Sequence, residues 1–523
     1  MAGMHRSPDR GPMIDRRAAL TLGAQIGLAS TGMLAACSNT TSGAGRGSTT
    51  TARSGSGRLL GAAGTNAAAT VAAYDPTVAF WKQGNFAPVP AETAATDLEV
   101  SGSLPPELDG LYARNGSNAP LNDATHWFLG DGMVHGIRFE RGTATWYRNR
   151  YVDTPNHRSG GGLLGGGIPG GAVTLSNVSV VHHGGRLLSL GEIGYPYELS
   201  TDDLATVGVH DFGGALTTSM TAHPKIDPAT GRMHSFGYSF APPYLTYHVI
   251  EPDGRLVSAE EVAVAGSTMM HDFAITERYV VFWEGPVVFD TAAISTGMPY
   301  RWSPEYGARV GVMPLGGPTS MIRWAEIDPC FVFHGVNAFE DGDDVVIDVC
   351  QLPEAFGPKG FLQPSHLHRW RVSGVGDPTG SLRVAVDQRD DTALDLPTID
   401  RRLTGRAARH AWLAHTVEDG PAGFELAGVS HYDLAANRQQ HWNPGDHYRA
   451  GEVTFVPRPG TDADPDGADG WVVCFAYDRT TDRSDLVVLD ALHIDRGPVA
   501  QVHLPVRVPF GFHGCWIAAD QLA

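Results

Sequence analysis

From about residue 95 onward, short runs of β-branched and aromatic residues alternate with turn signals along almost the entire chain. Such runs predict β-strands. Clear examples are YVVFW in 279–283, DVVIDVC in 344–350 and SDLVVLDAL in 484–492. Asp-Gly pairs at 131–132, 253–254 and 341–342 stand where hairpin loops are expected. Helical spacing is scarce and strands do not alternate with helices, so the pattern predicts an all-β chain.

The β-type pattern continues without a linker-like break to the end of the chain, over roughly 430 residues. One large domain is therefore expected from residue 76 to residue 523. A sandwich rarely needs so many strands, whereas a β-propeller of six to eight blades accommodates them around a central axis. No clean internal repeat marks the blades, so the strand pattern leaves the blade number open.

The first 75 residues have a different composition. Arg16-Arg17 precedes a weakly apolar segment that ends in Leu-Ala-Ala-Cys at Cys37. This pattern predicts a twin-arginine or lipoprotein-type export signal in 1–37, with Cys37 as a lipidated residue. A plain transmembrane anchor is the alternative, although the Gly, Ser, Thr and Gln content suits it poorly. Residues 38–75 are rich in Ser, Thr and Gly and predict a flexible tether, so we expect an exported protein anchored to the outer face of a bacterial cytoplasmic membrane.

Charge and cysteine content narrow the function classes. The chain carries 38 basic and 57 acidic residues, a formal net charge of −19, which argues against a nucleic-acid partner. Beyond Cys37 the cysteines are well separated and form no C-x-x-C pair, which excludes a zinc ribbon. We expect buried, unpaired thiols at Cys330, Cys350, Cys474 and Cys515.

Four histidines share a local setting at the edge of an apolar strand with turn residues beside it: His223, His271, His334 and His513. They do not follow the helical H-E-x-x-H spacing, so they can meet only where several elements converge, as at a propeller axis. A lone histidine at a strand edge is more often structural. His366 and His368, on one face of a strand, could also pair on a metal, whereas the adjacent His182 and His183 cannot point the same way.

Several longer segments of the chain form a set of motifs that can be compared with those of protein families. In order they are LYARNGSNAP (111–120), HWFLGDGMVHGIRF (126–139), TAHPKIDPATGRM (221–233), HDFAIT (271–276), FHGVNAFEDGDD (333–344), LHRWRVS (367–373), LPTIDRRLTGR (396–406), EVTFVPRP (452–459) and PVAQVHLPVRVPFGFHGCW (498–516). In this order the motifs resemble those of the carotenoid cleavage oxygenases, non-haem iron enzymes that cut conjugated double bonds with dioxygen.

The resemblance implies a seven-bladed β-propeller with a cap of loops and short helices over an iron on its axis. It implies one Fe(II) per subunit, bound by His223, His271, His334 and His513. It also implies three outer carboxylates, Glu192, Asp395 and Glu452, which accept the ring N–H groups opposite the metal. Asp395 departs from the glutamate that is usual there, so its hydrogen bond to a histidine could be direct, strained or water-bridged. Val178 stands where the family often has threonine or another small residue near the open iron position.

By the same resemblance, the expected activity is cleavage of a carotenoid or apocarotenoid double bond into carbonyl products with O2. A stilbene-type (lignostilbene) substrate is the alternative, and an exported propeller that binds lipophilic polyenes without cleaving them is another. The stilbene branch uses a lysine after the first hairpin, and this chain has none between residues 83 and 224. An apolar patch at Leu163, Leu164 and Ile168 makes peripheral membrane contact plausible, with a simple glycine-rich loop as the alternative.

Overall fold

The computed structural model describes residues 73–522, apart from 120–123, 125, 161–169, 297 and 419. The predicted export signal with Cys37, almost all of the predicted tether, and the patch at Leu163, Leu164 and Ile168 lie outside the described residues. Among the helices that are described, none has the length and apolar character needed to cross a bilayer.

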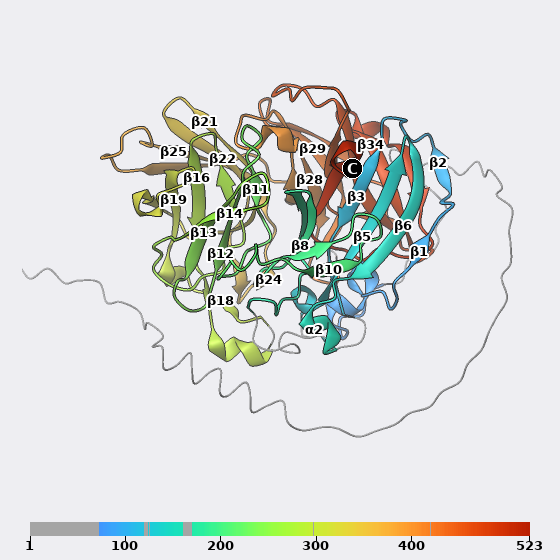
Figure 1. Cartoon of the computed structure of the whole chain (residues 1–523), viewed down its shortest axis with the longest axis horizontal. Coiled ribbons are helices and arrows are strands. Elements are labelled where there is room, and N and C mark those ends of the chain that lie inside the picture. Colours follow the sequence, from blue (N-terminus) through green and yellow to red (C-terminus); the bar gives the residue numbers. More distant parts are fainter. Residues whose placement is uncertain are drawn as a thin grey trace, which may run out of the picture. The chain divides into compact units, whose positions relative to one another are not determined.

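Seven sheets of at least four strands form the blades of a β-propeller, which confirms the predicted fold (Figure 1). The first blade contains β1 (Ala94–Ala95), β3 (Gly110–Arg114), β4 (Ser117–Asn118), β5 (Asp131–Glu140), β6 (Thr143–Tyr151) and β36 (Gly514–Ala518). The second contains β7 (Ser179–His183), β8 (Arg186–Leu190), β9 (Tyr197–Leu199) and β10 (Thr206–Val209). The third contains β11 (Lys225–Ile226), β12 (Met233–Tyr238), β13 (Leu245–Ile250) and β14 (Leu256–Glu261).

The remaining blades follow in chain order. The fourth contains β15 (Phe273–Ile275), β16 (Tyr279–Glu284), β19 (Ala308–Pro314) and β20 (Arg323–Ile327). The fifth contains β21 (Phe331–Asp341), β22 (Asp344–Leu352), β25 (His366–Ser373) and β26 (Arg383–Gln388). The sixth contains β27 (Leu394–Thr398), β28 (His410–Val417), β29 (Glu425–Asp433) and β30 (Arg438–Trp442). The seventh contains β2 (Val100–Gly102), β31 (Tyr448–Ala450), β32 (Thr454–Pro457), β33 (Gly470–Asp478), β34 (Arg483–Asp490) and β35 (Pro498–His503).

Short elements connect and cap the blades. Two hairpins are β17 (Val287–Phe289) with β18 (Tyr300–Trp302) and β23 (Ala355–Gly357) with β24 (Gly360–Leu362). Among the described residues the helices are α2 (Pro155–Arg158) and the 3-10 turns η1 (Phe80–Lys82), η2 (Gly84–Phe86), η3 (Trp127–Leu129), η4 (Thr291–Thr296), η5 (Pro304–Tyr306), η6 (Thr319–Met321), η7 (Arg401–Leu403), η8 (Ile494–Arg496) and η9 (Ala519–Gln521). The helical content is therefore as low as the sequence predicts.

The ring is closed twice, by strands from the two ends of the described chain. β36 pairs antiparallel with β3, from Gly110 opposite Ala518 to Arg114 opposite Gly514. β2 pairs antiparallel with β35, with Val100 opposite Val502. Figure 1 shows these early strands, in blue, among the late strands in red. Because pairing removes free sheet edges, this double closure ties the last strands of the chain to the first ones.

Packing between blades buries both faces of the middle strands. All six residues of β12 and of β13 are buried, whereas the outer strand β14 alternates between half-buried and exposed positions. Apolar clusters fill the spaces between neighbouring sheets; one of them joins Val310 and Trp283 of the fourth blade to Ile347 and Trp370 of the fifth. A strand buried on both faces needs apolar residues at every position, which explains the continuous apolar runs in the sequence.

Two of the three Asp-Gly predictions agree with the structure, and one is wrong. Asp253-Gly254 and Asp341-Gly342 lie at hairpin turns, but Asp131 begins β5. Asp131 is buried, and its carboxylate accepts hydrogen bonds from Nδ2 of Asn156 (2.9 Å) and Nδ1 of His157 (3.2 Å). Asn156 and His157 thus hold Asp131 in an extended strand, although the Asp-Gly dipeptide by itself favours a turn.

Candidate metal centre

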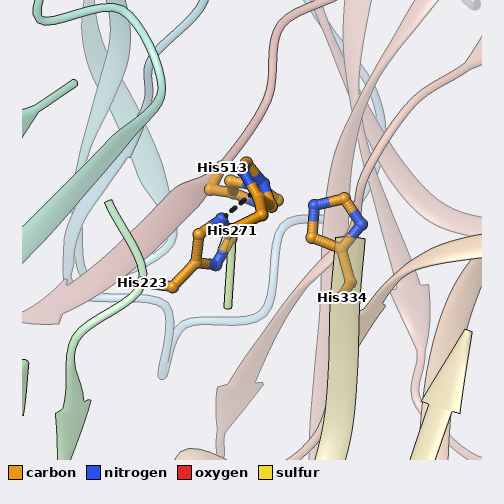
Figure 2. Close-up of side chains that lie close together, drawn as sticks. All are labelled: His223, His271, His334 and His513. Atoms are coloured by element: carbon orange, nitrogen blue, oxygen red, sulfur yellow. Dashed lines mark hydrogen bonds between the residues drawn. The ribbon is translucent and has the colours of Figure 1, made fainter. Parts of the chain in front are cut away.

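The four predicted histidines come from four blades and meet in one place. His223, His271 and His513 lie just before β11, β15 and β36, and His334 lies within β21. Each of these strands forms one end of its sheet, which brings the four histidines to a common point inside the ring. One nitrogen from each ring lies within 4.8 Å of the others, and Figure 2 shows the rings around a shared space.

The rings are closely packed and largely buried. Their centroids are separated by 4.4 Å for His223 and His271, 4.5 Å for His223 and His513, and 4.8 Å for His334 and His513. The Nε2 atoms of His223 and His271 are 2.9 Å apart. His271 and His334 are 8% and 9% exposed, so water reaches them poorly. Nitrogen atoms so close together form a ready set of donors for one cation.

In three of the four histidines, Nδ1 lies within hydrogen-bond distance of a carboxyl oxygen, which accepts the Nδ1 proton when the carboxylate is ionised. The distances are 3.0 Å from His271 to Glu192 Oε1, 2.7 Å from His334 to Asp395 Oδ1, and 2.7 Å from His513 to Glu452 Oε1. A proton held on Nδ1 leaves the lone pair of Nε2 free toward the centre of the cluster. Glu192 follows β8 in the second blade, Asp395 lies in β27 of the sixth blade, and Glu452 lies between β31 and β32 of the seventh blade.

The shorter side chain of Asp395 contacts its histidine directly. Its Oδ1 also accepts the Leu396 N–H at 2.8 Å, and its Oδ2 accepts the Ser365 hydroxyl at 2.9 Å. Of the direct, strained and water-bridged alternatives, the structure has the direct contact. Ser365, directly before β25, completes the environment of this carboxylate.

Burial and the neighbouring charges define the electrostatics of the cluster. Burial, reinforced by the other histidines, holds the pKa of His223 and His513 well below the usual value, so these rings are neutral. Burial also lowers the pKa of His271, but Glu192 outweighs that effect and raises it. Burial raises the pKa of Glu452 to about 8. A cation at the cluster would stabilise the ionised carboxylate, and neutral imidazoles are the form that binds metals.

The environment of His223 differs from that of the other three, and it contains residues that the sequence reasoning missed. Its Nδ1 is 3.9 Å from Oδ1 of Asp272, and the same oxygen is 2.7 Å from Nζ of Lys225. Tyr238 is a further missed neighbour, since its hydroxyl donates to Glu192 at 2.8 Å. Asp272 directly follows His271 and Lys225 stands two residues after His223, so adjacency to the predicted ligands was the available signal.

A cavity of about 200 Å³ opens onto three of the four histidines, His271, His334 and His513. Its wall is mainly apolar and includes Trp127, Phe128, Met269, Phe333, Leu426 and Phe512. Residues of η3, α2, β18 and β24 contribute to this wall, so loops, short helices and two hairpins cap the histidine cluster as predicted. Val178 also lines the cavity, and its carbonyl oxygen accepts the His513 backbone N–H at 2.9 Å, which places it beside a predicted ligand.

The competing histidines do not join the cluster. His366 and His368 lie on β25, where Nδ1 of His368 is bonded to the His366 carbonyl, and His182 and His183 end β7. Throughout the described part of the chain, the four-histidine cluster is the one group of histidine, cysteine and acidic residues with converging donor atoms. Cys330, Cys350, Cys474 and Cys515 are buried and unpaired, which confirms that prediction.

The donor set fits a divalent first-row transition metal. Four neutral imidazoles suit such ions, and ionised carboxylates beside three of the rings favour the tautomer that frees Nε2. The carboxylates behind them balance the charge that a divalent cation would bring. The geometry therefore supports a metal centre beside an apolar cavity.

Comparison with known proteins is consistent with this geometry. The family model described as retinal pigment epithelial membrane protein matches residues 86–518. A carotenoid cleavage oxygenase from Mycobacterium tuberculosis is 37% identical over 504 residues, covering 83% of this chain and 96% of its own length. The carotenoid 9,10(9',10')-cleavage dioxygenase 1 of Arabidopsis thaliana is 35% identical over 498 residues, covering 84% and 90%. The crystal structure of Pseudomonas brassicacearum lignostilbene dioxygenase matches with a TM-score of 0.76 and 30% identity, covering 86% of this chain and 100% of that one. The chain therefore belongs to the carotenoid cleavage oxygenase family.

Proposed function

We propose that this protein is an Fe(II)-dependent dioxygenase that cleaves a conjugated C=C bond of a carotenoid or apocarotenoid into two carbonyl products. The observation that carries the proposal is the cluster of four largely buried histidines, three of them beside carboxylates, at the wall of an apolar cavity. Membership of a family of double-bond-cleaving oxygenases supports the reaction type. The names of the relatives from Mycobacterium tuberculosis and Arabidopsis thaliana support the substrate class.

His223, His271, His334 and His513 would hold the iron. When bound, Fe(II) supplies the activation of dioxygen next to the substrate. The histidines contribute four neutral nitrogen donors, which leave coordination positions open and suit a ferrous ion. Glu192, Asp395 and Glu452 hold the rings in place and keep the proton on Nδ1.

The chain's other residues bind and align the substrate. The apolar wall would hold a polyene by burial of its surface, with Phe333 and Phe512 near the histidines. Both oxygen atoms of O2 enter the products, one in each carbonyl group, so the reaction requires no proton transfer. No general base is therefore needed, which agrees with the carboxylates being engaged in hydrogen bonds to histidines. Val178 would limit the space beside His513 and so bias where a small molecule can approach.

A stilbene-type phenolic substrate is the second candidate. The structural likeness to the lignostilbene dioxygenase supports it, because that match covers the whole of the other chain. The absence of lysine between residues 83 and 224 favours the carotenoid, since the stilbene branch uses a lysine in that region. A polyene-binding propeller without catalysis is the remaining alternative.

An aerobic substrate panel with iron quantification tests the proposal. Purified protein is assayed with a carotenoid, an apocarotenoid and a stilbene, and carbonyl products are identified by mass spectrometry. We expect stoichiometric iron, aldehyde products from a polyene, and loss of both in His513→Ala. His366→Ala is the matched control, because this histidine lies on β25 outside the cluster. Iron-free protein that binds polyenes without converting them would overturn the dioxygenase, and preferential stilbene cleavage would overturn only the substrate class.

Export and lipid anchoring are also part of the proposal. They are supported by the arginine pair and the Leu-Ala-Ala-Cys sequence ending at Cys37. An anchor at a bilayer would bring the apolar cavity close to membrane-dissolved substrates, and peripheral contact of the propeller with lipid would assist their entry. Fractionation of cells that express the full chain or Cys37→Ala tests this. Release of the variant into the soluble fraction is expected, and identical fractionation of both proteins would refute lipidation.

A further inference from the structure

Asp272 has an arrangement that none of the three outer carboxylates shares. It is 1% exposed, and its Oδ1 lies 2.7 Å from Nζ of Lys225, whose side chain is 21% exposed. The same Oδ1 accepts the Phe273 N–H at 2.8 Å, and Oδ2 accepts the Gly335 N–H at 2.9 Å. The carboxylate is thus fully engaged by one ammonium and two backbone donors. An ionised group held in this way stabilises the backbone that it contacts.

The contacts of Asp272 connect three of the strands that carry predicted metal ligands. Lys225 begins β11, two residues after His223. Phe273 begins β15, directly after the pair His271-Asp272, and Gly335 follows His334 in β21. These strands belong to three different blades, and no backbone pairing joins them, because each pairs only within its own sheet.

His223 needs such support more than the other ligands do. Its Nδ1 is 3.9 Å from Asp272, too far for a hydrogen bond, while His271, His334 and His513 have direct carboxylate partners. Before His223, the Thr221 N–H donates to the Phe236 carbonyl at 2.8 Å and the Ala222 carbonyl accepts the Ser179 hydroxyl at 2.6 Å. After His223, the segment continues into a strand of only two residues, β11, so this side of the histidine has little sheet pairing. The ion pair to Lys225 is the side-chain link that joins this segment to the carboxylate.

We propose that Asp272 and Lys225 form a positioning pair that sets the place of His223 relative to His271 and His334. The pair acts through backbone and side-chain contacts and does not itself bind the metal. Asp272 is then a fourth outer carboxylate of the site. It acts on His223, which has no direct carboxylate partner, through its ion pair with Lys225, two residues further along the chain. This inference rests on the proposed function, since it concerns the geometry of the proposed metal site.

Cobalt binding by the intact, metal-stripped protein tests the pair without an assay of activity. Co(II) is titrated against a competing chelator, and the visible absorption bands report the symmetry of the ligands. We expect Asp272→Asn and Lys225→Met each to weaken Co(II) binding by about 10- to 100-fold and to shift the bands, as loss of an outer partner typically does. The double variant should lose about as much as either single one, because the two residues act as a unit.

Asp348→Asn is the matched control. Asp348 is 2% exposed and pairs with Arg369 through two contacts of 2.8 Å, so this change also breaks a buried ion pair, but on β22 and β25. It should lower the melting temperature and leave cobalt affinity and spectrum unchanged. If Asp272→Asn does not fold, Lys225→Met, at a partly exposed side chain, provides the same test.

The outcomes separate the two proposals. Wild-type protein that binds no cobalt would overturn the four-histidine metal site itself. Wild-type binding together with unchanged affinity and spectrum in Lys225→Met or Asp272→Asn would overturn only the positioning pair. Additive losses in the double variant would contradict the relay from Asp272 through Lys225.

Discussion

Replacement of Glu452 by glutamine should favour the His513 tautomer that carries its proton on Nε2 and thereby weaken metal binding. Glu452 is 5% exposed; Oε1 accepts the proton of His513 Nδ1 at 2.7 Å, and Oε2 accepts the Gly514 N–H at 2.9 Å. A glutamine has one oxygen and one NH2 group for these two donors. Both neighbours are satisfied only if the oxygen faces Gly514 and the NH2 donates to an unprotonated Nδ1. The histidine proton then resides on Nε2, which removes the lone pair needed by a metal.

The magnitude follows from the alternative orientation of the amide. Metal binding requires the proton on Nδ1, so the glutamine oxygen must turn to His513 and its NH2 must face the Gly514 N–H. A buried N–H without a partner costs about 1–3 kcal/mol, which corresponds to a roughly 5- to 150-fold weaker metal affinity. The metal-free variant satisfies both hydrogen bonds and should melt close to the wild type.

Two measurements on the same samples check this reasoning. Affinity is obtained by titrating metal-stripped protein with Co(II) against a chelator, and the melting temperature is recorded without metal. Glu425→Gln is the control, because Glu425 is fully buried and its hydrogen bonds come from Arg449, at 2.6 Å, and Tyr74 rather than from a histidine of the cluster. It should lose stability and keep metal affinity. Wild-type affinity in Glu452→Gln would refute the argument that this carboxylate determines the histidine tautomer.

Three further predictions concern closure, side-chain length and pH. Removal of residues 511–523 should abolish chelator-resistant iron binding and also lower the melting temperature, because β36 is lost together with His513. The substitution His513→Ala should abolish iron binding and leave the melting temperature unchanged. Equal melting temperatures for the two variants would contradict the role of β36 in ring closure. Asp395→Glu should weaken Co(II) binding, since an added methylene must displace a direct contact of 2.7 Å, and tighter binding in calorimetry would contradict this. The hydrogen bond to Asp485 raises the pKa of His503 in the folded protein above its pKa in the unfolded chain. The pair therefore stabilises the folded state most strongly below about pH 6.5, and this stabilisation is lost as the pH rises through the pKa of the folded protein. The free energy of unfolding in urea should be higher for the wild type than for His503→Gln, and this difference should be up to about 1 kcal/mol larger at about pH 5.5 than at about pH 8.5. A difference that does not change with pH would refute the assignment.

Much of the architecture could be predicted from local patterns. Apolar runs bounded by turn residues predicted strands, because strand propensity and turn chemistry depend on neighbouring residues. Asp253-Gly254 and Asp341-Gly342 lie at turns for this reason. Asp131-Gly132 did not follow the rule, because Asn156 and His157 supply partners for the buried carboxylate from another part of the chain.

The ligand set shows the limit of spacing as a guide. His223 and His513 are separated by most of the propeller, so their residue types and positions alone could not distinguish them from His366 or His182. The resemblance to a family selected the four histidines, and the structure brings these four rings within reach of one cation. The contact geometry of Asp395 was likewise open, because the motif around it does not specify how far its backbone lies from His334.

Local patterns in the sequence predicted the strand content and most of the turns, since each depends on neighbouring residues, and the motifs pointed to the family and, through it, to the candidate histidines and outer carboxylates. Which groups meet depends on the folded ring: the four histidines at one point, the direct hydrogen bond between His334 and Asp395, the apolar cavity, and the Asp272–Lys225 pair. Ring closure explains this dependence. Pairing of β36 with β3 and of β2 with β35 fixes distances between residues hundreds of positions apart, and no local pattern specifies those distances.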